Sequence, residues 1–148
     1  MNKILTFIVN ENKEFLLLKT NPNDKQFKKS IWYTVTGEYE NKDNTLENTV
    51  KREIFEETGI SKINKTMYLN WILKYNSLGN NCTEYTYISF IKKQEITLNE
   101  ENIDYKWCNL EEFINNIDWF YNKLELKQVL DKALDNKLYF EEEKIEKL

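Results

Sequence analysis

Residues 52–57 contain charged side chains whose types and spacing suit the binding of a metal ion. If this stretch is a helix with about 100° between successive residues, Glu53, Glu56 and Glu57 fall within one arc of roughly 100°. Three clustered carboxylates repel one another unless a cation lies among them. Hard oxygen ligands suit Mg²⁺ or Mn²⁺, which also accept phosphate oxygens as ligands. We therefore expect these three glutamates to hold a divalent cation close to a phosphate group.

The hydrophobic residues around these acids predict the helix that presents them. They recur every four positions, at Leu46, Val50 and Ile54. Asn44, with Glu47 three residues later, has the pattern of an N-cap pair, and Gly59 follows the last hydrophobic position as a C-cap. The residues from Thr36 to the N-cap are expected to form a loop. The acids border the hydrophobic stripe instead of pointing away from it, which is unusual for a merely solvated charged face.

Composition draws attention to the same stretch. The chain has twenty lysines and a single arginine, Arg52, which lies beside the acids. A planar guanidinium can orient two carboxylates at once, whereas a lysine cannot. Of the three glycines, Gly37 and Gly59 bracket the stretch, and Gly37 would let the backbone approach a metal or phosphate closely. The alternative interpretation is an amphipathic surface helix with an acidic edge.

Residues 36–60 resemble the Nudix box, whose family pattern is Gly-x5-Glu-x7-Arg-Glu-(aliphatic)-x-Glu-Glu-x-Gly-(aliphatic). The second half matches at every fixed position from Arg52 onward, but the first half departs from the pattern. Counted back from Arg52, the glutamate position of the box holds Asn44; counted forward from Gly37, it holds Asp43, with one extra residue before Arg52. A one-residue insertion is the simpler explanation. It leaves open whether Asp43 replaces the missing acid.

The resemblance implies how the box residues act. Glu56 and Glu57 are expected to ligate Mg²⁺ or Mn²⁺, and Glu53 either ligates the ion or takes a proton from the attacking water. The Gly37 carbonyl is expected to add a ligand, and Arg52 to fix the orientation of the carboxylates. Divalent ions neutralise phosphate oxygens and activate water, as the hydrolysis of a phosphoanhydride requires.

The expected reaction is hydrolysis of a nucleoside diphosphate linked to another group. A nucleoside triphosphate cleaved to monophosphate and pyrophosphate is the favoured case, with dinucleoside polyphosphates and nucleotide sugars as alternatives. The run Trp32-x-x-Val-Thr-Gly37 is also similar to the branch with dihydroneopterin triphosphate and dATP pyrophosphohydrolases. Two rival hypotheses are a degenerate, non-catalytic nucleotide-binding Nudix domain and an acidic interaction protein with a chance motif.

Candidates for substrate contacts lie outside the box. Trp32 or Tyr33 could stack on a base, although core packing would explain them equally well. Lys28, in a lysine-rich loop, could contact a polyphosphate or simply be solvated. Glu100 or Glu101 is a candidate for the loop carboxylate that many Nudix enzymes bring to the metal, against the alternative of a solvated acidic turn.

The fold implied by the resemblance is of the α/β (α+β) class, an α/β/α sandwich in which helices flank a mixed β-sheet. A single domain is expected over residues 1–148. Strands are predicted at 3–9, 15–18, 31–35, 67–75, 84–91 and 105–108. Further helices should follow the caps Asn109 and Asn122, and the charged tail from Glu141 is expected to be helical or frayed.

Composition excludes several other classes of function. The net charge of −4 offers no electrostatic footprint for a nucleic acid polymer or an acidic membrane. Cys82 and Cys108 are too few and too far apart for a disulfide framework or a zinc site, and the chain has no histidine. No signal peptide or membrane span is recognisable. We therefore expect a cytoplasmic protein, monomeric or homodimeric, whose partner is a small nucleotide.

Overall fold

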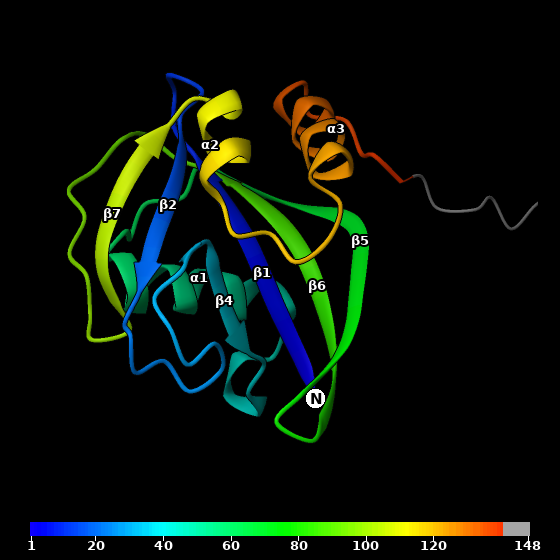
Figure 1. Cartoon of the computed structure of the whole chain (residues 1–148). Coiled ribbons are helices and arrows are strands. Elements are labelled where there is room, and N and C mark those ends of the chain that lie inside the picture. The colour runs from blue at the N-terminus through cyan, green and yellow to red at the C-terminus, as the bar shows by residue number, and fades with distance from the viewer. Residues whose placement is uncertain (141–148) are drawn as a thin grey trace, which may run out of the picture.

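The computed structural model describes residues 1–140, and the tail from Glu141 with its predicted helix lies outside the described residues (Figure 1). The strands are β1 (Asn2–Val9), β2 (Phe15–Thr20), β3 (Trp32–Tyr33), β4 (Val35–Glu38), β5 (Lys65–Ser77), β6 (Asn80–Phe90) and β7 (Asn102–Cys108). The helices are the 3₁₀ turn η1 (Asn41–Asp43) and the α-helices α1 (Leu46–Thr58), α2 (Leu110–Asn116) and α3 (Lys123–Leu134).

The strands form one mixed sheet built around β1. β6 runs parallel to β1 along its length, while β4 pairs antiparallel with its first half and β2 with its last residue. β5 then pairs with β6, and both β3 and β7 pair with β2. The predicted mixed sheet is confirmed. Its strand order brings β4 close to α1 and places the start of β7 beside the end of β2.

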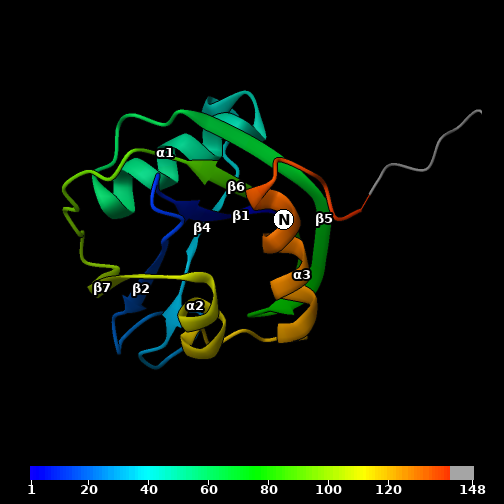
Figure 2. The same ribbon diagram turned by 90° about the horizontal axis from the view of Figure 1, so that it is seen from above.

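Helices cover both faces of this sheet. On one face Ile4 and Ile8 of β1 share a core with Val50 and Ile54 of α1. On the other face the intervening β1 residues share a core with hydrophobic residues of α2 and α3. Figure 2 shows α1 on one side of the strands and α2 and α3 on the other. A central strand buried on both faces lacks a polar side, which explains why β1 is hydrophobic almost throughout. The predicted α/β/α sandwich is confirmed.

Helix α1 begins one residue later than the sequence suggested. Thr45, not Asn44, is the N-cap, and its side chain accepts a hydrogen bond from the backbone N–H of Asn48 at 3.1 Å. Asn44 has a positive φ of 66° and closes the preceding 3₁₀ turn, so the predicted cap at Asn44 is wrong. Gly59 is confirmed as the C-cap, with φ 75° and its N–H bonded to the Phe55 carbonyl.

The chain that leads into α1 is more regular than expected. The strand predicted at 31–35 is interrupted at Thr34, whose hydroxyl donates to the Thr6 carbonyl at 2.6 Å. Residues before Thr34 therefore pair with β2 as β3, and residues after it pair with β1 as β4. Thr36 and Gly37, predicted to begin a loop, belong to β4. This extension of the sheet carries Gly37 to the side of α1.

The C-terminal helices begin at the predicted caps. Asn109 accepts a hydrogen bond from the N–H of Glu112 at 2.8 Å, and Asn122 from that of Glu125 at 2.9 Å. Among residues 1–140 no helix is both long and apolar enough to pass through a membrane.

Candidate active site

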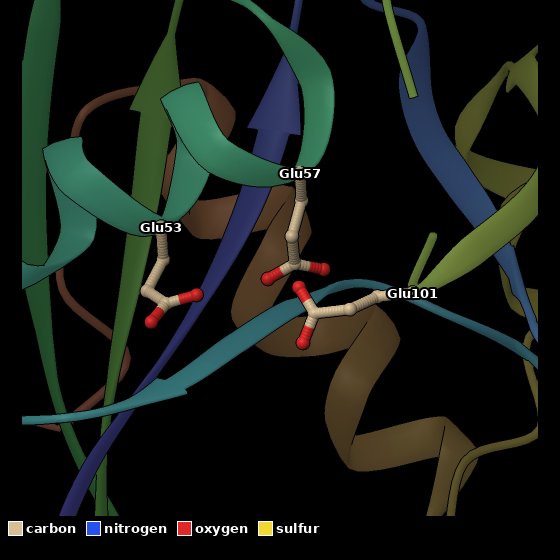
Figure 3. A group of neighbouring side chains, drawn as sticks. All are labelled: Glu53, Glu57 and Glu101. Atoms are coloured by element: carbon tan, nitrogen blue, oxygen red, sulfur yellow. The ribbon is translucent and has the colours of Figure 1, made fainter. Parts of the chain in front are cut away.

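Three glutamates from two parts of the chain converge at one end of α1. Glu53 and Glu57 project from the helix, and Glu101 reaches them from the residue before β7 (Figure 3). One carboxylate oxygen of each lies within 4.8 Å of the others. We call these three residues the acidic cluster. Of the two loop acids considered from the sequence, Glu101 is the one that joins it.

The two helix acids of the cluster are buried. Glu53 is 8% exposed and Glu57 6%. Burial raises the pKa of Glu53 to about 7, opposed by Arg52 and reinforced by the charge of Glu56. The pKa of Glu57 is raised well above its ordinary value, first by burial and then by the negative charges of Glu101 and Glu53. Both carboxyl groups are therefore poorly stabilised as anions by the protein alone.

One oxygen of Glu57 has a partner and the other does not. Asn102 Nδ2 donates to Glu57 Oε1 at 3.1 Å. Glu57 Oε2 is buried and finds no hydrogen-bond partner within residues 1–140. Buried polar atoms are seldom left unpaired. An unpaired carboxylate oxygen among three converging acids fits the ligand set of Mg²⁺ or Mn²⁺, both of which bind oxygen.

Gly37 packs directly against this cluster. A Cβ atom at position 37 would overlap the carboxyl group of Glu53. The absence of a side chain at Gly37 therefore allows Glu53 to occupy its position. This is the close backbone approach that the sequence suggested, made here to a glutamate side chain; the Gly37 carbonyl as a metal ligand stays a prediction.

Arg52 forms a paired contact with Asp43. Its Nε lies 2.8 Å from Asp43 Oδ1 and its Nη2 3.0 Å from Oδ2. Asp43 is buried and also accepts hydrogen bonds from the Thr49 hydroxyl and the Glu40 N–H. These contacts, above all that with Arg52, hold the pKa of Asp43 well below its usual range. Asp43, and not Asn44, is thus the residue that pairs with Arg52, which agrees with a one-residue insertion in the loop.

The other nitrogen of Arg52 faces the helix acids. Nη1 donates to Glu53 Oε1 at 2.8 Å and lies 3.3 Å from Glu56 Oε2, while Nη2 also donates to the Glu38 carbonyl. Glu56 is exposed and lies at the rim, outside the acidic cluster. Arg52 therefore connects the loop before α1 with Glu53, and its role in orienting the carboxylates stays a prediction.

An open cavity of about 560 Å³ extends from Glu57 and Glu101 to Phe27 and Tyr33. Its wall contains five acidic residues but only two lysines. A cavity with this balance of charge repels a phosphate-bearing ligand unless a cation is also bound. The geometry therefore suits an anionic ligand that enters together with a metal ion.

The candidate substrate residues are placed differently from one another. Tyr33 lines the cavity, whereas Trp32 does not and lies under the ammonium group of Lys106, 4.4 Å from the ring centre. Lys28 is exposed and outside the cavity wall, and Lys25 from the same loop lines it. The structure thus brings Tyr33, but neither Trp32 nor Lys28, to the cavity.

Sequence reasoning missed two polar residues beside the site. Asn102, which orients Glu57, lies in no recognisable motif, and its adjacency to Glu101 is the only signal that could have found it. Glu84 is buried in β6 within an alternating strand pattern. A carboxylate at a core-facing strand position was the available signal there.

Comparisons with known proteins agree with this geometry. The family model described as NUDIX domain matches residues 2–129. No curated protein sequence matches the chain.

Many solved structures share the fold. A MutT protein from Methanosarcina mazei Go1 has 23% identity and a TM-score of 0.71, with 89% of this chain and 95% of that chain covered. The NUDIX domain of Shewanella oneidensis NrtR, complexed with ADP ribose, has 18% identity and a TM-score of 0.71, covering 90% and 88%. The E. coli dihydroneopterin triphosphate pyrophosphohydrolase has 19% identity and a TM-score of 0.68, covering 86% and 92%. With the matched family model and the conserved arrangement of helix and sheet, the chain belongs to the Nudix family and is a Nudix hydrolase.

Proposed function

We propose that this chain is a Mg²⁺- or Mn²⁺-dependent hydrolase that cleaves a phosphoanhydride bond in a nucleoside diphosphate derivative. The favoured substrate is a nucleoside or deoxynucleoside triphosphate, with monophosphate and pyrophosphate as products. The observation that carries the proposal is the acidic cluster, with its unpaired Glu57 oxygen, at the end of a cavity large enough for a nucleotide. A cytoplasmic location and a monomeric or homodimeric state belong to the same proposal.

The residues that would hold the ion are Glu53, Glu57 and Glu101. Glu56 is a further proposed ligand, since it projects from the same helix beside Arg52, and so is the Gly37 carbonyl. A bound divalent cation neutralises phosphate oxygens and lowers the pKa of a coordinated water. All other contributions to substrate binding and proton transfer would come from the residues of the chain.

The protein residues would position the substrate and move a proton. Lys25 on the cavity wall would contact phosphate oxygens, and Tyr33 would offer a ring face to a base. Glu53, held by Arg52 and pressed against Gly37, is a proposed proton acceptor for the attacking water. The water oxygen forms a bond to phosphorus while the bridging P–O bond breaks. The leaving phosphate takes the bond electrons, and the proton of the water passes to the base.

The proposal is tested by product analysis with a panel of substrates. The wild-type protein is incubated with Mg²⁺ and nucleoside triphosphates, dinucleoside polyphosphates or nucleotide sugars, and the products are separated by ion-exchange chromatography. Release of monophosphate and pyrophosphate from triphosphates supports the favoured case. Cleavage of dinucleoside polyphosphates or nucleotide sugars alone identifies the alternative substrates. Nucleotide binding without cleavage would instead identify a non-catalytic binding domain.

A further inference from the structure

A second, smaller pocket of about 230 Å³ adjoins the main cavity. The two share four wall residues, Gln26, Phe27, Tyr33 and Thr36. The smaller pocket lies on the sheet face that α2 and α3 cover, beside the start of β1. A ligand with its phosphates at the acidic cluster could therefore extend another group into this pocket.

Aromatic rings form much of its wall. Phe27 and Phe120 are stacked with ring centres 5.4 Å apart, and Tyr33 lies 5.5 Å from Phe120. Tyr121 adds a further ring, and both Phe120 and Tyr121 remain more than a third exposed. Exposed rings grouped around a small pocket offer faces for stacking a flat heteroaromatic group.

The floor of the pocket carries a buried carboxylate. Glu84 is 3% exposed, and its Oε2 accepts a hydrogen bond from the Tyr75 hydroxyl at 2.8 Å. This bond uses one of roughly four acceptor positions of an ionised carboxylate. Burial raises the pKa of Glu84, although Tyr75 and Lys3 oppose that rise. A carboxylate held in this way has acceptor capacity left for hydrogen-bond donors on a ligand.

The ammonium group of Lys3, a hydrogen-bond donor, lies near the Glu84 carboxylate. The parallel pairing of β1 and β6 sets Lys3 opposite Glu84, so both side chains belong to the same face of the sheet. Lys3 is 9% exposed as a residue, and its ammonium group donates to Gln26 Oε1 at 3.1 Å. An ammonium group has three donors, and Lys3 retains donors for a ligand. The acceptor in the smaller pocket therefore has a donor beside it on the wall of the main cavity.

This pattern distinguishes among the common bases. A carboxylate is best matched by two adjacent donors. Guanine offers a ring N–H beside an amino group, with a carbonyl oxygen on the other side of the N–H for a donor such as Lys3. Adenine and cytosine place a ring acceptor beside the amino group, and uracil and hypoxanthine have the ring N–H without the amino group. We propose that the smaller pocket, lined by Glu84 and Tyr75 and bordered by Lys3 on the wall of the main cavity, is a base-binding subsite selective for a guanine-type ring.

The proposal rests on the proposed function for the placement of the phosphates, but it can be tested separately. Binding of GMP, IMP and AMP to the full chain is measured by calorimetry with Mg²⁺ present, and because a nucleoside monophosphate has no phosphoanhydride bond, the test does not depend on hydrolysis. GMP should bind about tenfold more tightly than IMP, which differs by the missing amino group. Glu84→Gln should bring GMP to the affinity of IMP while leaving IMP much less affected.

Controls keep this test decisive. Tyr75→Phe retains the ring but removes the donor to Glu84, and it should reduce the preference for GMP less than Glu84→Gln does. Thermal unfolding shows whether each variant is folded. Equal affinity of the wild type for the three nucleotides, or no measurable GMP binding, overturns the subsite. Hydrolysis without a base preference would refute the base-binding subsite and leave the proposed function intact. Selective GMP binding without hydrolysis would support the subsite and contradict the proposed function.

Discussion

At the level of single residues, the feature that needs an explanation is the burial of Glu57. Its pKa is raised by burial and by two neighbouring acids, and one of its oxygens has no partner within residues 1–140. Leaving a buried charged group unpaired destabilises a fold. The arrangement is understandable if a cation completes it. Glu101 is exposed, and its carboxylate nevertheless lies close to the two buried helix acids, an approach that a shared cation would also explain.

We predict that Glu57→Gln and Glu101→Gln each reduce turnover by about 100-fold or more, because each removes a negative oxygen ligand. Glu47→Gln is the matched control, since Glu47 lies on the same helix but pairs only with Lys51 at the exposed surface. Steady-state rates at saturating Mg²⁺ measure the effect. Wild-type turnover in Glu101→Gln would exclude the loop acid from the site.

A second residue-level prediction concerns Gly37. Gly37→Ala should reduce turnover strongly, because the added methyl group would displace the Glu53 carboxyl group. Gly79→Ala is the control: no atom lies within 4 Å of the added methyl group, and the strain from its φ of 82° affects the exposed turn alone. Rates for both variants are compared with the wild type. Equal activity of the two variants would show that the close approach at Gly37 is unimportant.

At the level of elements, the turn η1 and helix α1 act as one unit. Asp43 at the end of the turn is joined to Arg52 in the helix by two hydrogen bonds, and Arg52 then contacts Glu53. The position of a catalytic candidate therefore depends on a short turn ten residues earlier. This dependence predicts that the pair stabilises the protein as well as orienting the acids.

The stability contribution of Asp43 should depend on pH. The pKa of Asp43 is lowered in the folded protein, from an ordinary value of 3.8. Its ionised form therefore stabilises the fold fully above that ordinary value, and this stability is lost as the pH falls through the lower, folded value. Asp43→Asn should reduce the free energy of unfolding by about 3 kcal/mol at pH 7. The difference should persist at pH 5 and narrow below about pH 4.

Urea unfolding of both proteins at each pH measures this difference. Acids that do not share Arg52 with Asp43 titrate alike in the wild type and the variant, so their contributions cancel in the comparison. A difference that widens on acidification would contradict the assigned pairing.

The sequence predicted most of the elements but not the details around the site. The period of Leu46, Val50 and Ile54 identified α1, and the caps at Asn109 and Asn122 identified α2 and α3. The start of α1 was misplaced because Asn44 and Thr45 are both good capping residues. Only the backbone of the turn decides between them, and it gives Asn44 a positive φ.

The candidate site also has residues that the sequence predicted and residues that it did not. Arg52, Glu53 and Glu57 could be found because their spacing follows the geometry of one helix. The parts contributed by other elements could only be narrowed to alternatives, Glu100 or Glu101 and Asp43 or Asn44. Which residue of each pair reaches the site depends on how β7 and η1 pack against α1. This long-range packing leaves no local pattern in the sequence.

At the level of the whole molecule, the sheet brings distant segments to one end of α1. β4 carries Gly37 along the first half of β1, and the segment before β7 carries Glu101 to the same place (Figures 1 and 3). The parallel pairing of β1 with β6 places Lys3, on the wall of the main cavity, beside Glu84, on the wall of the adjoining pocket. Residues from Met1 to Tyr121 thus border one cavity system, and a nucleotide bound there would contact elements separated by about a hundred residues.

The central claim is that the acidic cluster binds the divalent ion, and Mn²⁺ binding measured by electron paramagnetic resonance tests it most directly. Free Mn²⁺ gives a signal that is lost on binding, so affinity is obtained without a substrate or turnover. We predict that the wild type and Glu47→Gln bind Mn²⁺ with equal affinity, while Glu57→Gln binds at least tenfold more weakly. Equal affinity of all three proteins would place the ion elsewhere and contradict the account.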